Sequence, residues 1–93
     1  MNIELVYWKL KKSDPSIHSL NELIDRECLS LWSKVENLKD KIWFEDQSRG
    51  YWGALMIWEE EKPDLSQLPP NSPREIIGRA PDVRLSFNLL SRI

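Results

Sequence analysis

Apolar residues recur with two different periods in the first part of the chain. Residues 3–10 (IELVYWKL) are rich in β-branched and aromatic side chains and end at a Lys-Lys-Ser-Asp-Pro break, which predicts a strand and a turn. Steps of three and four follow, which predict one long amphipathic helix: Ile17, Leu20, Ile24, Cys28, Leu31, Val35 and Leu38. Its N-cap is Asp14 or Ser16, or the helix begins one turn later at the capping-box spacing of Ser19 and Glu22.

The second half of the chain predicts a hairpin, an irregular segment and a last strand. Residues 41–58 form two apolar runs around the turn-forming stretch 46–50, which is typical of a β-hairpin. The prolines between residues 63 and 73 exclude a second long helix and leave a short one from Pro73 to Gly78. Residues 82–90 alternate as a closing strand. The order β-α-β-β-(short α)-β predicts a single α+β domain over residues 1–93, a ferredoxin-like sandwich with a four-stranded antiparallel sheet.

The polar residues of the hairpin indicate which side of the sheet lies under the helix. Lys41 and Glu45 are poor residues to bury, so Ile42 and Phe44 are expected on the helix side. By the same alternation, the other strands are expected to place Ile3, Leu5, Tyr7, Val83, Leu85 and Phe87 under the helix. The far face is then expected to carry Glu4, Val6, Trp8, Lys41, Trp43, Arg84, Ser86 and Asn88.

Residues 51–58 (YWGALMIW) do not alternate, and an antiparallel strand that is apolar on both sides needs a cover on both. One long helix covers only one face. A second copy of the chain is therefore expected to cover the other, as a two-fold homodimer. The alternative is a monomer in which the proline-rich segment 63–73 folds over that face.

Composition and charge exclude several classes of partner. The 93 residues carry 13 basic and 15 acidic side chains, mixed along the chain, for a net charge of −2. No basic stripe exists to neutralise a phosphate backbone, so no nucleic acid partner is expected. The apolar runs are too short to span a membrane and the N-terminus lacks a signal-peptide pattern, so we expect a cytoplasmic protein with no membrane partner. The single cysteine, Cys28, is expected to be a packing residue in the helix.

The segments around the hairpin resemble a known family. Asn37-Leu38, then Lys41-Ile42-Trp43, then the run from Gly50 through Trp58 (GYWGALMIW) are similar to the ydhR-like group of monooxygenases. That group belongs to the dimeric α/β-barrel superfamily, together with antibiotic-biosynthesis monooxygenases. The resemblance implies a homodimer whose two sheets form a barrel, with a largely apolar pocket in each protomer. After Glu59 this chain departs from the family pattern, because the proline-rich segment replaces the usual second long helix.

Aromatic residues supply the candidate ligand-binding surface. Five tryptophans occur in the chain, and flat indole walls suit an aromatic ligand. Trp8 and Trp43, on the expected far face, are candidates for a pocket or equally for a dimer interface. Trp32 and Trp52 are expected to be packing residues. Met56, from the uniformly apolar strand, is a further candidate for lining the pocket.

His18 is the only histidine and the side chain that most readily exchanges a proton near neutral pH. Its place at the helix start favours an exposed or capping role over catalysis. One histidine and one cysteine do not supply the three or four converging ligands of a zinc or iron site, so no metal is expected.

Polar residues of the far face are the other candidates for chemistry. Arg84 and Asn88, with Lys41 and Ser86, could hold a phenol or carboxylate oxygen of a ligand. The alternative is that these charges form ion pairs at the rim of the dimer, for example Lys41 or Arg84 with Glu4 or Glu45.

Three functions are consistent with these residues. The first, implied by the resemblance, is a monooxygenase that needs no cofactor and acts on an aromatic substrate in an apolar pocket. The second is a non-catalytic homodimer that binds a small hydrophobic ligand or has a structural or regulatory role. The third, haem binding or degradation, requires a histidine in the pocket, where His18 is poorly placed.

Overall fold

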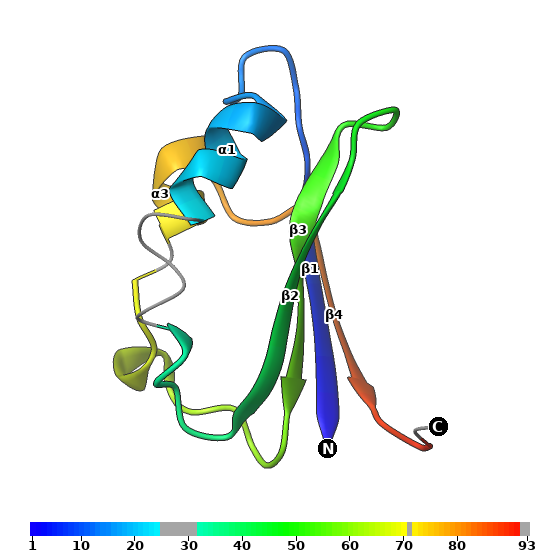
Figure 1. Ribbon diagram of the computed structural model, residues 1–93, viewed down its shortest axis with the longest axis vertical. Helices are drawn as coiled ribbons and strands as arrows, with labels where there is room; N and C mark the ends of the chain where they lie inside the picture. The colour runs from blue at the N-terminus through cyan, green and yellow to red at the C-terminus, as the bar shows by residue number, and fades with distance from the viewer. Residues whose placement is uncertain (25–31, 71, 92–93) are drawn as a thin grey trace.

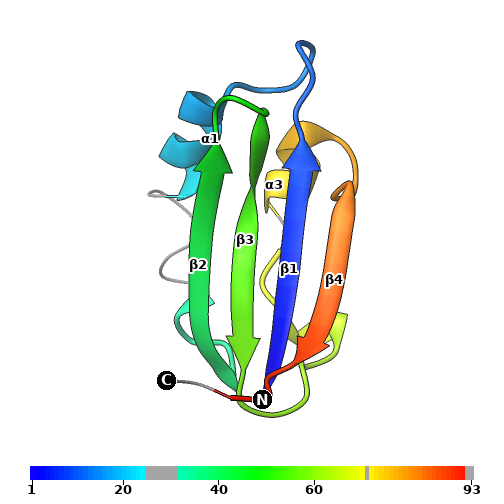
Figure 2. The ribbon, with the colours of Figure 1, turned by 90° about the vertical axis from the view of Figure 1, so that its right-hand side faces the viewer.

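A computed structural model describes residues 1–24, 32–70 and 72–91 of the protein. The described elements follow one another as β1 (Asn2–Lys9), α1 (Ile17–Leu23), β2 (Leu38–Asp46), β3 (Tyr51–Trp58), the 3₁₀ turn η2 (Leu65–Gln67), α3 (Ser72–Ile77) and β4 (Val83–Asn88). The four strands form one antiparallel sheet in the order β2-β3-β1-β4 (Figure 2). Helices α1 and α3 lie on the same side of this sheet (Figure 1). This small α+β arrangement is consistent with the predicted ferredoxin-like sandwich.

Helix α1 begins at one of the predicted alternative N-caps. Ser16 is the N-cap, and its Oγ accepts a hydrogen bond from the backbone N–H of Ser19 at 3.1 Å. The end predicted near Leu38 is wrong, since Leu38 is already the first residue of β2 and residues 33–37 form turns. Asn37 has a φ of 67°, which a short polar side chain tolerates and a continuing helix does not. The prediction for Cys28 falls outside the described residues.

The last two apolar positions of the predicted helix, Val35 and Leu38, keep a helical spacing without lying in a helix. Val35 and Leu38 both pack against the buried cluster around Trp58 from a turn and a strand start. Residues that pack on one cluster from an irregular segment can imitate a helical period over two steps. The short helix after the prolines is confirmed as α3, and Gly78, with a φ of 89°, ends it by donating its N–H to the carbonyl of Arg74 at 2.8 Å.

The face of the sheet beneath the helices is the opposite of the one predicted. The alternation was assigned correctly, because Glu4, Val6 and Trp8 share a face with Trp43. That face, however, is the inner one, covered by the helices. The residues predicted under the helix lie instead on the outer face, where they are half-buried or exposed: Ile3, Leu5, Tyr7, Ile42, Phe44, Val83, Leu85 and Phe87.

Indole burial explains this inversion. Trp8, Trp52 and Trp58 point to the inner face and are only 2%, 0% and 1% exposed. A buried tryptophan removes roughly 150–250 Å² from water, which is worth about 4–6 kcal/mol at ~25 cal/mol per Å². The burial of three such residues contributes more free energy than it costs to place Lys41 and Glu45 on the same face. That cost is small because Lys41 and Glu45 sit on the edge strand β2, where they find polar or aromatic partners.

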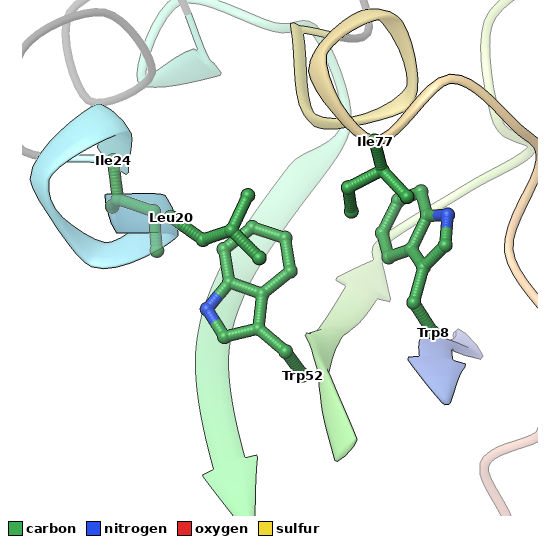
Figure 3. Packing of buried hydrophobic residues seen from close by; sticks show 5 residues of the cluster. All are labelled: Trp8, Leu20, Ile24, Trp52 and Ile77. Carbon is green, nitrogen blue, oxygen red and sulfur yellow. The ribbon is translucent and has the colours of Figure 1, made fainter. Parts of the chain in front are cut away.

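Two helices complete the upper part of the inner core. Leu20 of α1 packs on Trp52 and Ile77 of α3 packs on Trp8, and Ile24, the C-cap of α1, belongs to the same buried cluster (Figure 3). The proline-rich segment lies on this same side, so it does not cover the outer face as the monomer alternative requires (Figure 1). Within residues 1–24, 32–70 and 72–91, no helix or turn lies over the outer face of the sheet.

The outer face carries continuous apolar rows across all four strands. One row runs Ile42, Leu55, Leu5 and Leu85 from β2 to β4. Phe44 and Tyr7 meet across Gly53 in the next row, with ring centroids 6.3 Å apart. Ile42 is 52% exposed, Leu85 46% and Phe87 50%.

Candidate functional site

A pocket of about 300 Å³ lies between the inner face of the sheet and the proline-rich segment. Val6 and Ala54 form its floor. Leu68 and three prolines, Pro69, Pro70 and Pro73, line it from the opposite side. Its volume is at the lower end of the range for small-molecule sites, which is about 300–1,000 Å³.

The register of the strands explains why a pocket exists at this place. Trp43 of β2 pairs with Ala54, Ala54 with Val6, and Val6 with Arg84 of β4. The row therefore has two large side chains at its ends and two small ones in its middle. Because the central side chains are short, the proline-rich segment spans them without filling the space above.

Tryptophans form the aromatic wall of the pocket. Trp43 stacks on Trp52, with centroids 5.0 Å apart and an interplanar angle of 29°, and Trp52 contacts Trp8 at 5.9 Å. Lys41 places its Nζ 3.2 Å from the ring centroid of Trp32 and 4.7 Å from that of Trp43. An ammonium between two indole faces is held by cation–π attraction, so this wall combines flat apolar surface with positive charge.

Charged residues occupy the other end of the pocket. Glu4 is buried at 7% exposure and accepts hydrogen bonds from Lys62 Nζ at 3.1 and 3.0 Å, to Oε1 and Oε2. Arg84 Nη1 donates to the same Oε2 at 2.9 Å. A buried carboxylate needs such partners, and these two come from β4 and from the segment after β3. The predicted alternative in which Arg84 pairs with Glu4 is thus realised, within one chain.

A second ion cluster fixes the position of Trp8. Arg79 contacts Asp14 through Nη2 at 2.7 Å and Asp82 through Nη1 at 2.6 Å, and its carbonyl accepts from Trp8 Nε1 at 3.0 Å. A backbone hydrogen bond from Lys11 and the Arg79 guanidinium lower the pKa of Asp14. A backbone hydrogen bond from Lys9, together with Arg79, lowers the pKa of Asp82, and the two carboxylates raise the pKa of Arg79.

The structure brings together most of the predicted site residues. Trp8, Trp43, Lys41, Met56 and Arg84 all line the pocket. They do so from the helix side of the sheet, whereas the sequence pattern placed them on the far side.

Three predicted candidates lie elsewhere. Ser86 and Asn88 line a separate groove of about 330 Å³ near the end of the sheet, which shares only Glu4 and Lys62 with the pocket. The side chain of His18 is 85% exposed on α1, where its Nε2 lies 3.2 Å from Glu22 Oε1. The exposed role expected for His18 is confirmed, and Ser16 provides the cap.

Several pocket residues were not predicted from the sequence, among them Trp32, which was expected to be a packing residue and lines the pocket. Glu4 was named only as an ion-pair partner, and Lys62 was not considered, because the two are 58 positions apart. The prolines were interpreted as a loop, although Pro69 and Pro70 form a wall of the pocket. The one signal in the sequence was Glu4, an acidic residue within an otherwise apolar strand, which needs an ionic partner if it is buried.

The described part of the chain contains no group of three or more His, Cys, Asp or Glu side chains placed to hold a metal ion. None of its helices is long and apolar enough to cross a membrane. No family model and no curated protein matches the sequence. The resemblance to ydhR-like monooxygenases therefore stays a prediction.

Proposed function

We propose that the protein binds a flat aromatic small molecule in the tryptophan-walled pocket and acts as a homodimer joined through its outer sheet faces. The observation that carries the first part is the row from Trp43 to Arg84, in which Ala54 and Val6 leave an apolar floor between two large side chains. An apolar pocket with a small number of polar groups is the usual form of a ligand site.

The shape and chemistry of the walls favour a planar ligand. Trp43 is backed by Trp52, so its ring is held by stacking rather than by the ligand itself. Trp8 is held by its hydrogen bond to the carbonyl of Arg79. Side chains that are fixed before binding lose little conformational entropy when the ligand arrives, which favours affinity.

Binding is tested by titrating ¹⁵N-labelled protein with 2-naphthol and following the indole N–H signals by NMR. We expect saturable shifts of the Trp8 and Trp43 signals in the wild type, and weaker binding in a Trp43→Leu variant. A Trp58→Phe variant is the matched control, because Trp58 does not line the pocket. An absence of saturable shifts in the wild type would refute the binding function.

The outer face supports the homodimer. With a strand spacing of ~4.8 Å and a rise of ~3.3 Å per residue, the four strands of six to nine residues cover about 500 Å² before side-chain relief is counted. Apolar patches of this size on a monomer are often functional. A second copy provides the same rows of Ile42, Leu5 and Leu85, and a two-fold axis lets the two faces cover each other. Together the two sheets would form the barrel expected from the resemblance.

The dimer is tested by sedimentation of variants with one new charge. Ile42→Glu and Leu85→Glu, on the outer face, are expected to shift the protein to monomer. Ile76→Glu is the matched control, because Ile76 is 49% exposed but lies on α3, on the other side of the sheet. A wild type that sediments as a monomer at high concentration would contradict the dimer, as would a dimer that survives both outer-face substitutions.

Oxidation of a phenol without metal or flavin is a second candidate, favoured by Lys41. Its ammonium in the aromatic wall would stabilise a phenolate, the electron-rich form that reacts with O₂. For 1-naphthol the reaction balances as one phenol plus one O₂ giving 1,4-naphthoquinone and one water. Oxygen consumption with 1-naphthol that falls in a Lys41→Met variant would support this activity. Binding of 1-naphthol without any oxygen consumption would leave the binding function and contradict the oxidation.

A further inference from the structure

One end of the pocket carries more positive than negative charge. Lys62 and Arg84 both bind the single carboxylate of Glu4, at 3.0 and 2.9 Å. Among the described residues that line the pocket, Glu4 is the one acidic side chain. In a partly apolar site such an excess favours a negatively charged ligand, because Coulomb attraction is stronger there than in water.

The position of Arg84 relates this charge to the aromatic floor. Arg84 and Trp43 lie at opposite ends of one row, three strand spacings apart, or about 14 Å at ~4.8 Å per strand. A bicyclic ring lying over Val6 and Ala54 would contact Trp43 at one side. A substituent at its other side would then reach the guanidinium of Arg84.

The donor groups at this end suit a carboxylate. Among the described residues the side chain of Arg84 hydrogen-bonds to Glu4 alone, through Nη1, which leaves other N–H donors of its planar fork for a second acceptor. Arginine binds carboxylates through two parallel hydrogen bonds more readily than it binds neutral groups. The side chains of Lys62 and Arg84 are 32% and 44% exposed, so a ligand can approach both.

We propose that the ligand of the pocket is an aromatic carboxylate, whose acid group binds Arg84 and Lys62 in competition with Glu4. This inference rests on the proposed binding function and specifies the class of its ligand. It assigns opposite roles to neighbouring residues, because Arg84 and Lys62 attract the ligand while Glu4 competes with it.

The test compares 2-naphthoate with 2-naphthamide, which have the same ring and differ in charge. Calorimetric titration at neutral pH is expected to show the wild type binding the carboxylate about tenfold or more tightly than the amide. Arg84→Met and Lys62→Met are each expected to reduce this preference. Glu4→Gln is expected to increase it, an effect that a merely structural role of the ion pairs would not produce. Lys12→Met, which removes a charge from the exposed loop after β1, is the control that should keep the wild-type preference.

The outcomes separate the inference from the function on which it rests. If both compounds bind equally, the carboxylate inference is wrong and the aromatic site stands. If neither binds, the aromatic site is wrong and the inference fails with it. A preference that survives in both Arg84→Met and Lys62→Met, with thermal melts showing that the variants fold, would also overturn the inference.

Discussion

Trp43 and Arg84 lie at the two ends of a single inward-facing row of the sheet, separated only by Ala54 and Val6. The two large end residues and the two small central ones define both the size of the pocket and its polarity, aromatic at one end and cationic at the other. Substitutions in this row are therefore expected to change ligand binding.

Ala54→Leu is expected to fill the floor of the pocket and weaken binding of 2-naphthoate by about tenfold or more, with a stability change no larger than about 1–3 kcal/mol. Both quantities can be followed on the same sample, by calorimetric titration and by urea unfolding. Ala80→Leu adds the same side chain at an exposed position and should leave binding unchanged. Undiminished binding in Ala54→Leu would place the ligand outside this pocket.

The three buried indoles differ in their hydrogen bonds. Trp8 Nε1 donates to the carbonyl of Arg79 at 3.0 Å and Trp52 Nε1 to Asn21 Oδ1 at 2.9 Å. Trp58 Nε1 is buried and has no acceptor among the described residues. Replacement by phenylalanine removes a similar volume at each site, so Trp8→Phe and Trp52→Phe should each cost about 1 kcal/mol more than Trp58→Phe. Urea unfolding measures the difference, and a larger loss for Trp58→Phe would contradict it.

Gly53 allows the close approach of β1 and β3. A Cβ built at this position would lie 2.0 Å from the carbonyl oxygen of Val6 and 2.5 Å from Tyr7 Cβ. Both neighbours belong to the central strand β1 and cannot move easily, so Gly53→Ala should cost about 3 kcal/mol or more. Gly78→Ala meets no atom within 4 Å and should cost only the ~1–2 kcal/mol of a left-handed backbone. Chemical denaturation of both variants gives the comparison, and equal losses would refute the role of the close approach.

Acid should weaken the protein through the Arg79 cluster. Asp14 and Asp82 have pKa values below the ordinary 3.8 when folded, so their ionised forms stabilise the folded state. This stabilisation is fully present above about pH 4 and is lost as the pH falls below 3.8 through the lowered folded pKa values. Thermal melts of the wild type should show the fall, and an Asp14→Asn, Asp82→Asn double variant should show a shallower one. Asp46 also has a lowered pKa, caused mainly by hydrogen bonds from Ser48 and Arg49, so Asp46→Asn measures the contribution of the hairpin turn separately.

The sequence correctly predicted which residues share a face of the sheet, but not which face the helices cover. Alternation along a strand correctly indicated that Trp8, Trp43, Lys41 and Arg84 share a face, because side-chain direction repeats every two residues. Which face the helices cover depends on the total apolar surface of each side. There the tryptophans of β1 and β3 outweighed the polar residues of the edge strand β2 that guided the prediction.

Long-range contacts account for most of what the sequence did not reveal. The pairing of Glu4 with Lys62 joins the first strand to an irregular segment, and no local pattern indicates it. The end of the predicted helix was misplaced because Val35 and Leu38 pack on the core from a turn and a strand while keeping a helical spacing.

The central claim is that an aromatic ligand binds between the inner face of the sheet and the proline-rich segment. Intermolecular NOEs between 2-naphthoate and ¹³C-labelled protein test it most directly, because the inner pocket and the outer apolar face have different side chains. NOEs are expected from the naphthalene ring to Trp43, Val6 and Met56. NOEs only to Ile42, Leu85 and Phe87 would show that the ligand binds the outer face, and would contradict the claim.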